Sequence, residues 1–168
     1  MALKNQKWNK ILELFFEFPT KGFTVREISK KTRIPTSSVQ RYLKALSKEG
    51  FIDKENKAVI TPYFKFRKTF FIIDKIFKSG LMEYLNKKFN PSCVILFGGA
   101  RKGEYDKESD VDLFIESTKE MKADLAKFEK ELGHVIQLFV EKDINDLNPR
   151  LRNNVINGIK LIGYFKVK

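Results

Sequence analysis

The sequence predicts an α+β protein of two domains, in which a helical N-terminal domain precedes a C-terminal α/β domain built on a mixed sheet. Apolar residues recur at helical spacing through the N-terminal part, whereas short apolar runs alternate with helical segments after residue 90. The 168 residues, of which 42% are hydrophobic, suffice for two small cores. We expect domains at residues 1–62 and 91–168, joined by a helical segment at residues 63–90.

Positive charge is concentrated in the first domain. The chain has a formal net charge of +12, and residues 1–65 hold 14 Lys or Arg against 6 Asp or Glu, a net charge of +8. A basic surface attracts polyanions because binding releases their counterions, so nucleic acid is the first partner to consider. Lysine-rich surfaces also occur in proteins that bind no nucleic acid, and charge alone leaves both interpretations open.

The sequence lacks the features of secreted and membrane proteins. Cys93 is the single cysteine, which excludes an internal disulfide and a cysteine-cluster metal site, and we expect it to be a small buried side chain. The first ten residues lack the apolar core of a secretory signal, and no run approaches about 18 apolar residues. We therefore expect a cytoplasmic protein with no membrane span.

The pattern of the N-terminal domain predicts three helices and a hairpin. Thr24 and Glu27 have the spacing of a capping box at the start of the second helix. Pro35 interrupts the helical pattern, and Thr36 or Ser37 can cap a third helix. Two short alternating runs around a polar turn predict the hairpin. In order, we expect a helix at residues 4–18, a short strand at 23–24, helices at 25–31 and from 36 to near 50, and a hairpin at 51–60.

The segment from Phe23 to Pro62 resembles the winged helix-turn-helix family, and the resemblance covers about residues 5–62. In that fold the third helix enters the major groove of duplex DNA, while the wing contacts phosphates. The resemblance implies that Arg41 pairs with guanine and Gln40 with adenine. The implied DNA-binding residues are Thr36, Ser37, Ser38, Gln40, Arg41 and Lys44 on the helix, with Lys54 and Lys57 on the wing.

The remaining chain predicts a helical connection followed by alternating strands and helices. The connection is rich in phenylalanine and breaks at Ser79 and Gly80. After it we expect strands at residues 93–97, 111–115 and 135–140, with a glycine turn after the first strand and a helix at residues 119–132.

Asp110 and Asp112 open a predicted strand and are candidate metal ligands. They flank Val111, so both carboxylates project from one face of the strand. Hard oxygen ligands of this kind suit Mg²⁺, with phosphate oxygens completing its shell. Gly98 and Gly99 end the preceding strand where a short helix starts, so backbone N–H groups can approach a triphosphate. Metal and phosphate are thereby brought to one point.

The segment from Phe97 to Glu116 resembles the minimal nucleotidyltransferase family, within the superfamily that includes DNA polymerase beta and kanamycin nucleotidyltransferase. The resemblance covers about residues 88–145 and rests on Gly98, Gly103, Ser109, Asp110, Asp112 and Leu113. It implies that Asp110 and Asp112 are catalytic and hold Mg²⁺ with a nucleoside triphosphate, ATP being the first choice, while an acceptor hydroxyl attacks the α-phosphate. The implied nucleotide-binding residues are Gly98, Gly99, Arg101, Gly103 and Ser109.

Two departures from the family pattern bear on activity. Gly99 stands where the family usually has Ser, and Gln137 stands where a third carboxylate is expected. His134 and Glu141 are near this gap, but strand parity puts His134 on the opposite face, and Glu141 is about 13 Å further along. With two of three expected carboxylates, the sequence leaves enzymatic activity open.

Three hypotheses of function agree with these patterns. The first is a DNA-binding regulator whose second domain binds Mg-nucleotide, with slow or no transfer. The second is an active nucleotidyltransferase that modifies a protein or small molecule, as in toxin–antitoxin pairs, where a neighbouring gene encodes the partner. The third is a scaffold whose winged helix contacts protein. A homodimer is a further expectation, because winged-helix regulators commonly read two half-sites.

Overall fold

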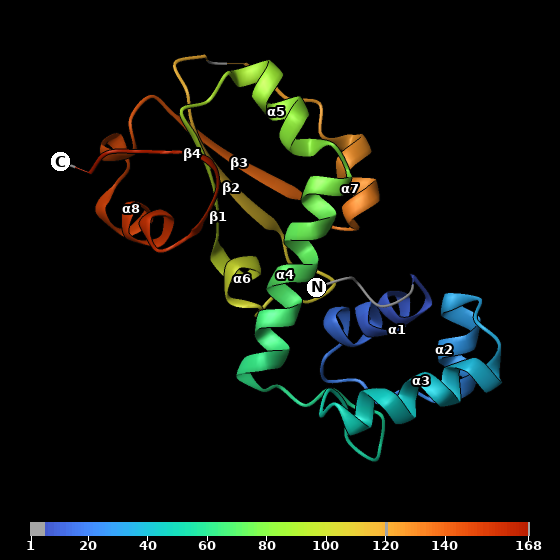
Figure 1. Ribbon diagram of the computed structural model, residues 1–168. Helices are drawn as coiled ribbons and strands as arrows, with labels where there is room; N and C mark the ends of the chain where they lie inside the picture. Colours follow the sequence, from blue (N-terminus) through green and yellow to red (C-terminus); the bar gives the residue numbers. More distant parts are fainter. Residues whose placement is uncertain (1–5, 120, 168) are drawn as a thin grey trace. The chain divides into compact units, whose positions relative to one another are not determined.

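The computed structural model describes residues 6–119 and 121–167, and it divides the chain into two compact units, Met1–Lys65 and Phe66–Lys168 (Figure 1). Helix α4 (Pro62–Lys78) begins in unit 1 and continues in unit 2. Residues 4 and 5 of the first predicted helix, and residue 120 of a later one, lie outside the described residues. Within the described ranges, no helix combines the length and the apolar character needed to cross a membrane.

Unit 1 packs three helices, α1 (Gln6–Glu17), α2 (Val25–Thr32) and α3 (Thr36–Lys48), around an aromatic core. Each helix buries the apolar stripe that its spacing predicts. Phe64, from the first turn of α4, packs edge to face against Phe16, with ring centroids 5.1 Å apart. The largest fully buried side chains of this core are Phe15, Phe16, Phe23, Phe51 and Phe64.

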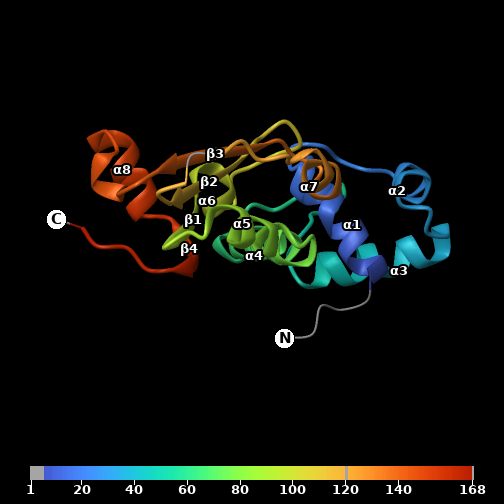
Figure 2. The same ribbon diagram turned by 90° about the horizontal axis from the view of Figure 1, so that it is seen from above.

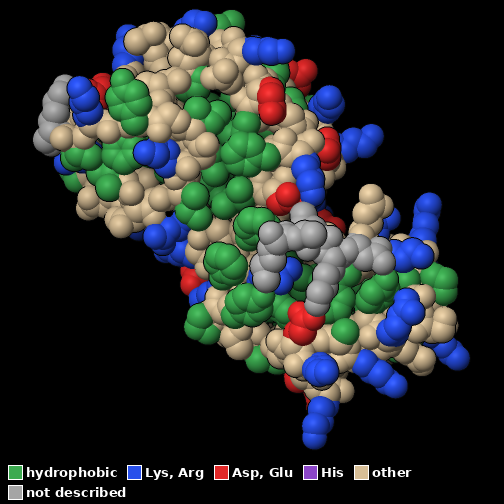
Figure 3. Space-filling view, in the orientation of Figure 1, with side chains coloured by type: hydrophobic (Ala, Val, Ile, Leu, Met, Phe, Trp, Pro, Cys, Tyr) green, Lys and Arg blue, Asp and Glu red, His purple; other side chains and the backbone are tan. Residues whose placement is uncertain are grey.

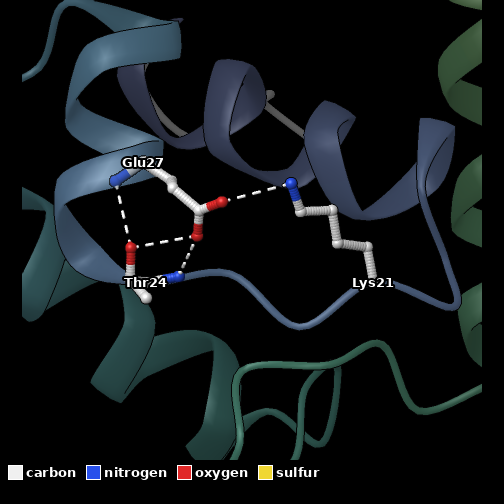
Figure 4. Close-up of polar contacts among 3 residues, drawn as sticks. All are labelled: Lys21, Thr24 and Glu27. Carbon is white, nitrogen blue, oxygen red and sulfur yellow. Dashed lines mark hydrogen bonds and ion pairs between the residues drawn. The ribbon is translucent and has the colours of Figure 1, made fainter.

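The start of α2 is fixed by the predicted capping box, which the structure confirms (Figure 4). The Thr24 hydroxyl accepts a hydrogen bond from the Glu27 amide at 3.2 Å, and the Glu27 carboxylate accepts one from the Thr24 amide at 2.8 Å. Lys21 forms an ion pair with Glu27 at 3.2 Å. These contacts, the Thr24 backbone hydrogen bond first among them, lower the pKa of Glu27 to about 2.

The turn between α2 and α3 is tight because a non-glycine residue takes the left-handed conformation. Arg33 has a φ of 58°, and its amide donates to the Ser29 carbonyl at 2.9 Å. The Ser29 hydroxyl donates in turn to the Ile34 carbonyl at 2.7 Å. Two helices joined by this closed turn form the predicted helix-turn-helix pair.

The predicted hairpin is shorter than expected. A single antiparallel bridge joins Ile52 to Ala58, in place of two paired strands. The turn closes early because the Asp53 carboxylate accepts hydrogen bonds from two amides within it, at 2.9 Å each. The strand predicted at residues 23–24 is wrong: Phe23 instead exchanges two hydrogen bonds of 3.1 Å with Asn56 at the tip of this turn.

Unit 2 is built on a four-stranded mixed sheet, which confirms the predicted architecture. The strand order is β3-β2-β1-β4, with β1 antiparallel to β2 and β4, and β2 parallel to β3. The strands are β1 (Cys93–Phe97), β2 (Val111–Glu116), β3 (Ile136–Glu141) and β4 (Ile159–Gly163).

Helices cover both faces of this sheet. Val94 and Leu96 of β1 pack into a core with α4, α5 (Leu81–Phe89) and α7 (Ala126–Leu132), and Figure 2 shows α4 and α5 along that face. Cys93, Ile95 and Phe97 pack into a second core with the short helix η1 (Ile144–Asp146) and α8 (Pro149–Ile156). Cys93 is fully buried, as predicted.

Two predicted boundaries in unit 2 had different outcomes. The break between α4 and α5 is confirmed, since the Ser79 hydroxyl caps the Ile76 carbonyl at 2.8 Å and Gly80 takes a φ of 76°. The helix predicted at residues 119–132 is wrong over its first part, because α7 begins only at Ala126. The Asp124 carboxylate accepts a hydrogen bond from the Ala126 amide at 3.3 Å, and Leu125 is the N-cap residue of the helix, without a side-chain capping bond.

Candidate functional site

The candidate site of unit 2 lies where β1 ends and β2 begins, at the short helix α6 (Gly98–Lys102). Phe97 pairs with Asp112, so the chain that leaves β1 passes beside the Asp112 side chain. Gly98 has a φ of 68°, and a β-carbon added to it would collide with Oδ2 of Asp112. Position 98 therefore requires glycine for its backbone conformation and for the room that the carboxylate occupies.

Asp110 and Asp112 lie on the same face of the chain at the start of β2. Both are half-buried, whereas Val111 between them is buried in the core. Burial raises the pKa of Asp112, and the negative charge of Asp110 raises it further. Two carboxylates repel each other beside the turn at Gly98. A divalent cation fits such a pair because it would offset both negative charges. Among the described residues, no group of three or more His, Cys, Asp or Glu side chains could hold a metal ion.

Gln137 occupies the neighbouring position on β3. It is the register partner of Asp112, and its side-chain amide donates a hydrogen bond to Oδ2 of Asp110 at 2.5 Å. The pairing of β2 with β3 is continuous from Val111 to Glu116, so no bulge shifts the parity of the strand. A neutral amide therefore stands beside the two carboxylates, where a third carboxylate was expected.

His134 and Glu141 lie away from this point. His134 is buried, its Nδ1 lies 2.9 Å from the Ser109 carbonyl, and its ring meets the edge of Tyr105 with centroids 5.4 Å apart. Because a carbonyl only accepts, Nδ1 carries the hydrogen in this contact. Glu141 pairs with Glu116 at the opposite end of β2 from Asp112.

The other predicted nucleotide-binding residues surround the turn that begins at Gly98. Gly99 has room for a β-carbon, which would lie in ordinary van der Waals contact with its nearest neighbours at 3.9 Å. Arg101 is half-buried on α6, and Gly103 ends that helix with a φ of 67°. The Ser109 hydroxyl is engaged within the loop, because it donates to Oδ1 of Asp106 at 2.8 Å and accepts from the Asp106 amide at 2.9 Å.

Sequence reasoning missed two residues that hold this turn in place. The Lys68 ammonium donates to the Tyr105 carbonyl, and the Thr69 hydroxyl donates to the carbonyls of Ala100 and Arg101 at 3.2 Å each. Lys68 and Thr69 lie on α4, within a phenylalanine-rich pattern that draws attention to the core. Two adjacent polar residues, a lysine and a threonine, on the buried face of that helix could have indicated a polar contact with another part of the chain.

The predicted DNA-contacting residues of unit 1 form a second candidate site. Val39, Leu43 and Leu46 turn inward, which leaves the predicted contact residues on the outer side of α3. Gln40 and Lys44 line a depression of about 380 Å³ together with Lys54 of the bridge turn. All the predicted residues are exposed except Ser38, which is half-buried: Thr36, Ser37, Gln40, Arg41, Lys44, Lys54 and Lys57. Figure 3 shows Lys and Arg side chains around the visible surface of this unit, at the lower right.

Comparison with known proteins assigns both units. Residues 79–164 match the family model described as polymerase beta, nucleotidyltransferase. Residues 20–74 match the model of the sugar-specific transcriptional regulator TrmB. Comparison with curated proteins and with solved structures finds no match. The first match spans half of the chain and contains Gly98, Asp110 and Asp112, and the chain therefore belongs to the polymerase beta nucleotidyltransferase family, with a TrmB-type helix-turn-helix regulator domain preceding the transferase domain.

Proposed function

We propose that this protein is a DNA-binding regulator whose nucleotidyltransferase domain binds a Mg²⁺-nucleoside triphosphate and transfers its nucleotide slowly or not at all. One observation carries the proposal: Asp110 and Asp112 share one face beside Gly98, whereas the third position belongs to the neutral Gln137. Such a site retains the groups that bind a metal-nucleotide and lacks the group that would remove a proton.

The two carboxylates would hold the cation, and the turn at α6 would hold the phosphates. Gly98 and Gly99 leave backbone amides without a covering side chain, and Arg101 supplies a positive charge beside them. Mg²⁺, when bound, would neutralise phosphate charge and thereby favour attack at the α-phosphate. ATP is the first nucleotide to test.

The DNA-binding part of the proposal rests on unit 1. The outer side of α3 offers Gln40, Arg41 and Lys44, which are side-chain types that pair with bases or phosphates, and Lys54 and Lys57 extend this surface. The residues up to position 65 carry a net charge of +8. Duplex DNA is the polyanion that a helix-turn-helix domain of this charge fits best, and a regulator of this kind would act in the cytoplasm, as a homodimer where its site has two halves.

An active transferase is the second candidate, and membership in the polymerase beta family favours it. In that case a protein or small molecule would receive the nucleoside monophosphate, and a product of the neighbouring gene, as in a toxin–antitoxin pair, is the first acceptor to examine. The Gln137 amide argues against it, because an amide cannot act as a general base at neutral pH.

Calorimetry with ATP and Mg²⁺ tests the proposed nucleotide site. Asp110→Asn and Asp112→Asn should each lower metal-dependent affinity by about tenfold or more, which corresponds to about 1.4 kcal/mol. Glu141→Gln removes one carboxylate from the far end of the same strand pair and should leave the affinity unchanged. Nucleotide affinity that is unchanged by both Asp substitutions, or by the addition of a chelator, would contradict the metal site. If DNA binding were absent as well, the results would favour the scaffold hypothesis.

A further inference from the structure

Lys68 is buried on α4 with its charged end turned toward the backbone of the candidate site. Its side chain is among the least exposed of the described residues, its Nζ donates to the Tyr105 carbonyl, and the same atom lies 4.5 Å from the centroid of the Tyr105 ring. Burial lowers the pKa of this ammonium to about 8. An apolar side chain would fill the same space without this cost of burying a charge, so the hydrogen bond to Tyr105 calls for an explanation.

Thr69, the next residue, holds the other side of the same turn. Its hydroxyl reaches the carbonyls of Ala100 and Arg101, in the last turn of α6. Lys68 and Thr69 therefore bind the chain before and after Gly103, the residue at which α6 ends. The Glu104 amide also donates to the Gly99 carbonyl at 3.0 Å, which makes the turn a closed loop tied to α4.

Tyr105 extends this support toward Asp110. Its hydroxyl donates back to the Lys68 carbonyl at 3.1 Å, and its ring packs against His134. His134 Nδ1 donates to the carbonyl of Ser109, the residue before Asp110. An unbroken series of contacts thus leads from α4 to both parts of the site, the glycine turn and the first carboxylate.

We propose that Lys68 and Thr69 are positioning residues for metal-nucleotide binding: they fix the turn 98–105 so that its amides and the Asp110 carboxylate face one ligand. This inference rests on the proposed nucleotide site and adds to it residues that touch neither metal nor nucleotide. Binding groups that are already fixed before the ligand arrives avoid the entropy loss of ordering a loop on binding. A more mobile turn should therefore bind the metal-nucleotide more weakly, even though no direct contact is removed.

Lys68→Met and Thr69→Val test the proposal, because each keeps the approximate volume and removes the donor. Both should weaken ATP binding in the presence of Mg²⁺ by about tenfold, measured by calorimetry at a temperature where circular dichroism shows each variant folded. Hydrogen exchange of the amides at residues 98–105 should become faster in both variants. Thr69→Ser retains the hydroxyl and should restore wild-type affinity and exchange.

Lys75→Met is the matched control, since Lys75 is also an α4 lysine that donates to a backbone carbonyl, that of Leu132 at 2.7 Å. It should change neither ATP affinity nor exchange at residues 98–105. Folded Lys68→Met and Thr69→Val proteins with wild-type exchange in the turn would overturn the proposal, whether or not the wild type binds ATP. Absence of ATP binding by the wild type, with faster exchange in these variants, would instead overturn the nucleotide site and leave the support of the turn by α4 intact. Should Lys68→Met not fold, the Thr69→Val and Thr69→Ser pair decides the outcome.

Discussion

The side-chain amide of Gln137 donates a hydrogen bond to Oδ2 of Asp110, across the parallel pair of β3 and β2. The same amide stands opposite Asp112 in the register of the two strands. A carboxylate at position 137 would place a third negative charge at this point, where it could bind a cation and accept a proton. In the proposed function, the residue at position 137 therefore decides whether a site that binds Mg-nucleotide can also transfer the nucleotide.

Gln137→Asp should convert weak or absent transfer into measurable transfer. The new carboxylate supplies a general base, an effect typically worth about 10²- to 10⁴-fold in rate. Gly99→Ser in the same chain should add a phosphate contact, because the space around Gly99 accepts a β-carbon. Pyrophosphate release from ATP under single-turnover conditions measures the gain, and water takes the nucleoside monophosphate where no other acceptor hydroxyl is supplied.

Gln137→Asn keeps a neutral amide and is the control for this gain. Gly98→Ser places a side chain against the Asp112 carboxylate and should abolish nucleotide binding instead. Robust turnover in the wild type that His134→Ala abolishes, and that changes at Gln137 leave untouched, would contradict the assignment and favour a histidine base.

Arg41→Ala combined with Lys44→Ala should weaken binding to duplex DNA and reduce its dependence on salt. Both side chains are exposed on the outer side of α3, and the salt slope should fall by about one for each phosphate that the variant no longer binds. Fluorescence anisotropy over a range of salt concentrations measures both effects. Lys10→Ala with Lys31→Ala removes the same charge from a different depression of unit 1. This double variant should weaken the binding of duplex DNA much less. Equal weakening in the two double variants would mean that net charge alone, and no particular helix, binds the DNA.

The capping box makes the stability of unit 1 depend on pH in the acid range. The folded pKa of Glu27, about 2, lies below its ordinary value of 4.5, so the carboxylate contributes stability above pH 4.5 and loses it as the pH falls toward 2. Thermal melts of the wild type and of Glu27→Ala should therefore differ at neutral pH and converge as the pH falls through this window. Melting curves that stay equally far apart at pH 7 and at pH 2 would show that the charge of Glu27 contributes nothing.

Cys93 should report the opening of the sheet of unit 2. Burial, with Glu116 as a further cause, raises the pKa of the thiol to about 12, so the folded protein should resist alkylation and thiol reagents. A raised pKa contributes stability that is fully present below the ordinary pKa of 9 and declines as the pH rises toward 12. Labelling of the Cys93 thiol that follows global unfolding in denaturant would support its burial in the sheet. Rapid labelling of the folded protein would contradict this burial.

The local patterns that predicted the fold were those in which one short segment determines its own structure. The Thr24 and Glu27 pair, the break at Ser79 and the alternation around Val111 each depend on neighbours within a few residues. The helix predicted from residue 119 extended too far because helix propensity continues through this segment, whereas α7 begins only at Ala126. The C-terminal elements α8 and β4 were not predicted, although the segment from Val155 to Phe165 is rich in apolar residues. The packing of α8 and the pairing of β4 with β1 depend on contacts with a strand far away in the sequence.

The candidate site was predictable in part for the same reason. Asp110 and Asp112 are close neighbours in the sequence, and a family pattern identifies them. The family pattern identified position 137 as that of the missing third carboxylate, and strand parity put His134 on the opposite face. The hydrogen bond between Gln137 and Asp110 was not predicted. Lys68 lies 37 residues from Tyr105, and only the folded chain brings a lysine of one helix to the carbonyl of a distant loop.

Helix α4 sets the limits within which the two parts of this chain can be separated or recombined. The nucleotidyltransferase family match begins at residue 79, yet Ile72 and Ile76 of α4 lie in the core beneath the sheet, and Lys68 and Thr69 bind the loop of the site. A fragment cut at the family boundary would expose that core and leave carbonyls of Ala100 and Tyr105 without these donors. The nucleotidyltransferase domain therefore keeps its core and the support of its loop only when residues 66–78 of α4 remain attached to it. A gene fusion that exchanged the helix-turn-helix domain would have to join the two parts upstream of residue 66.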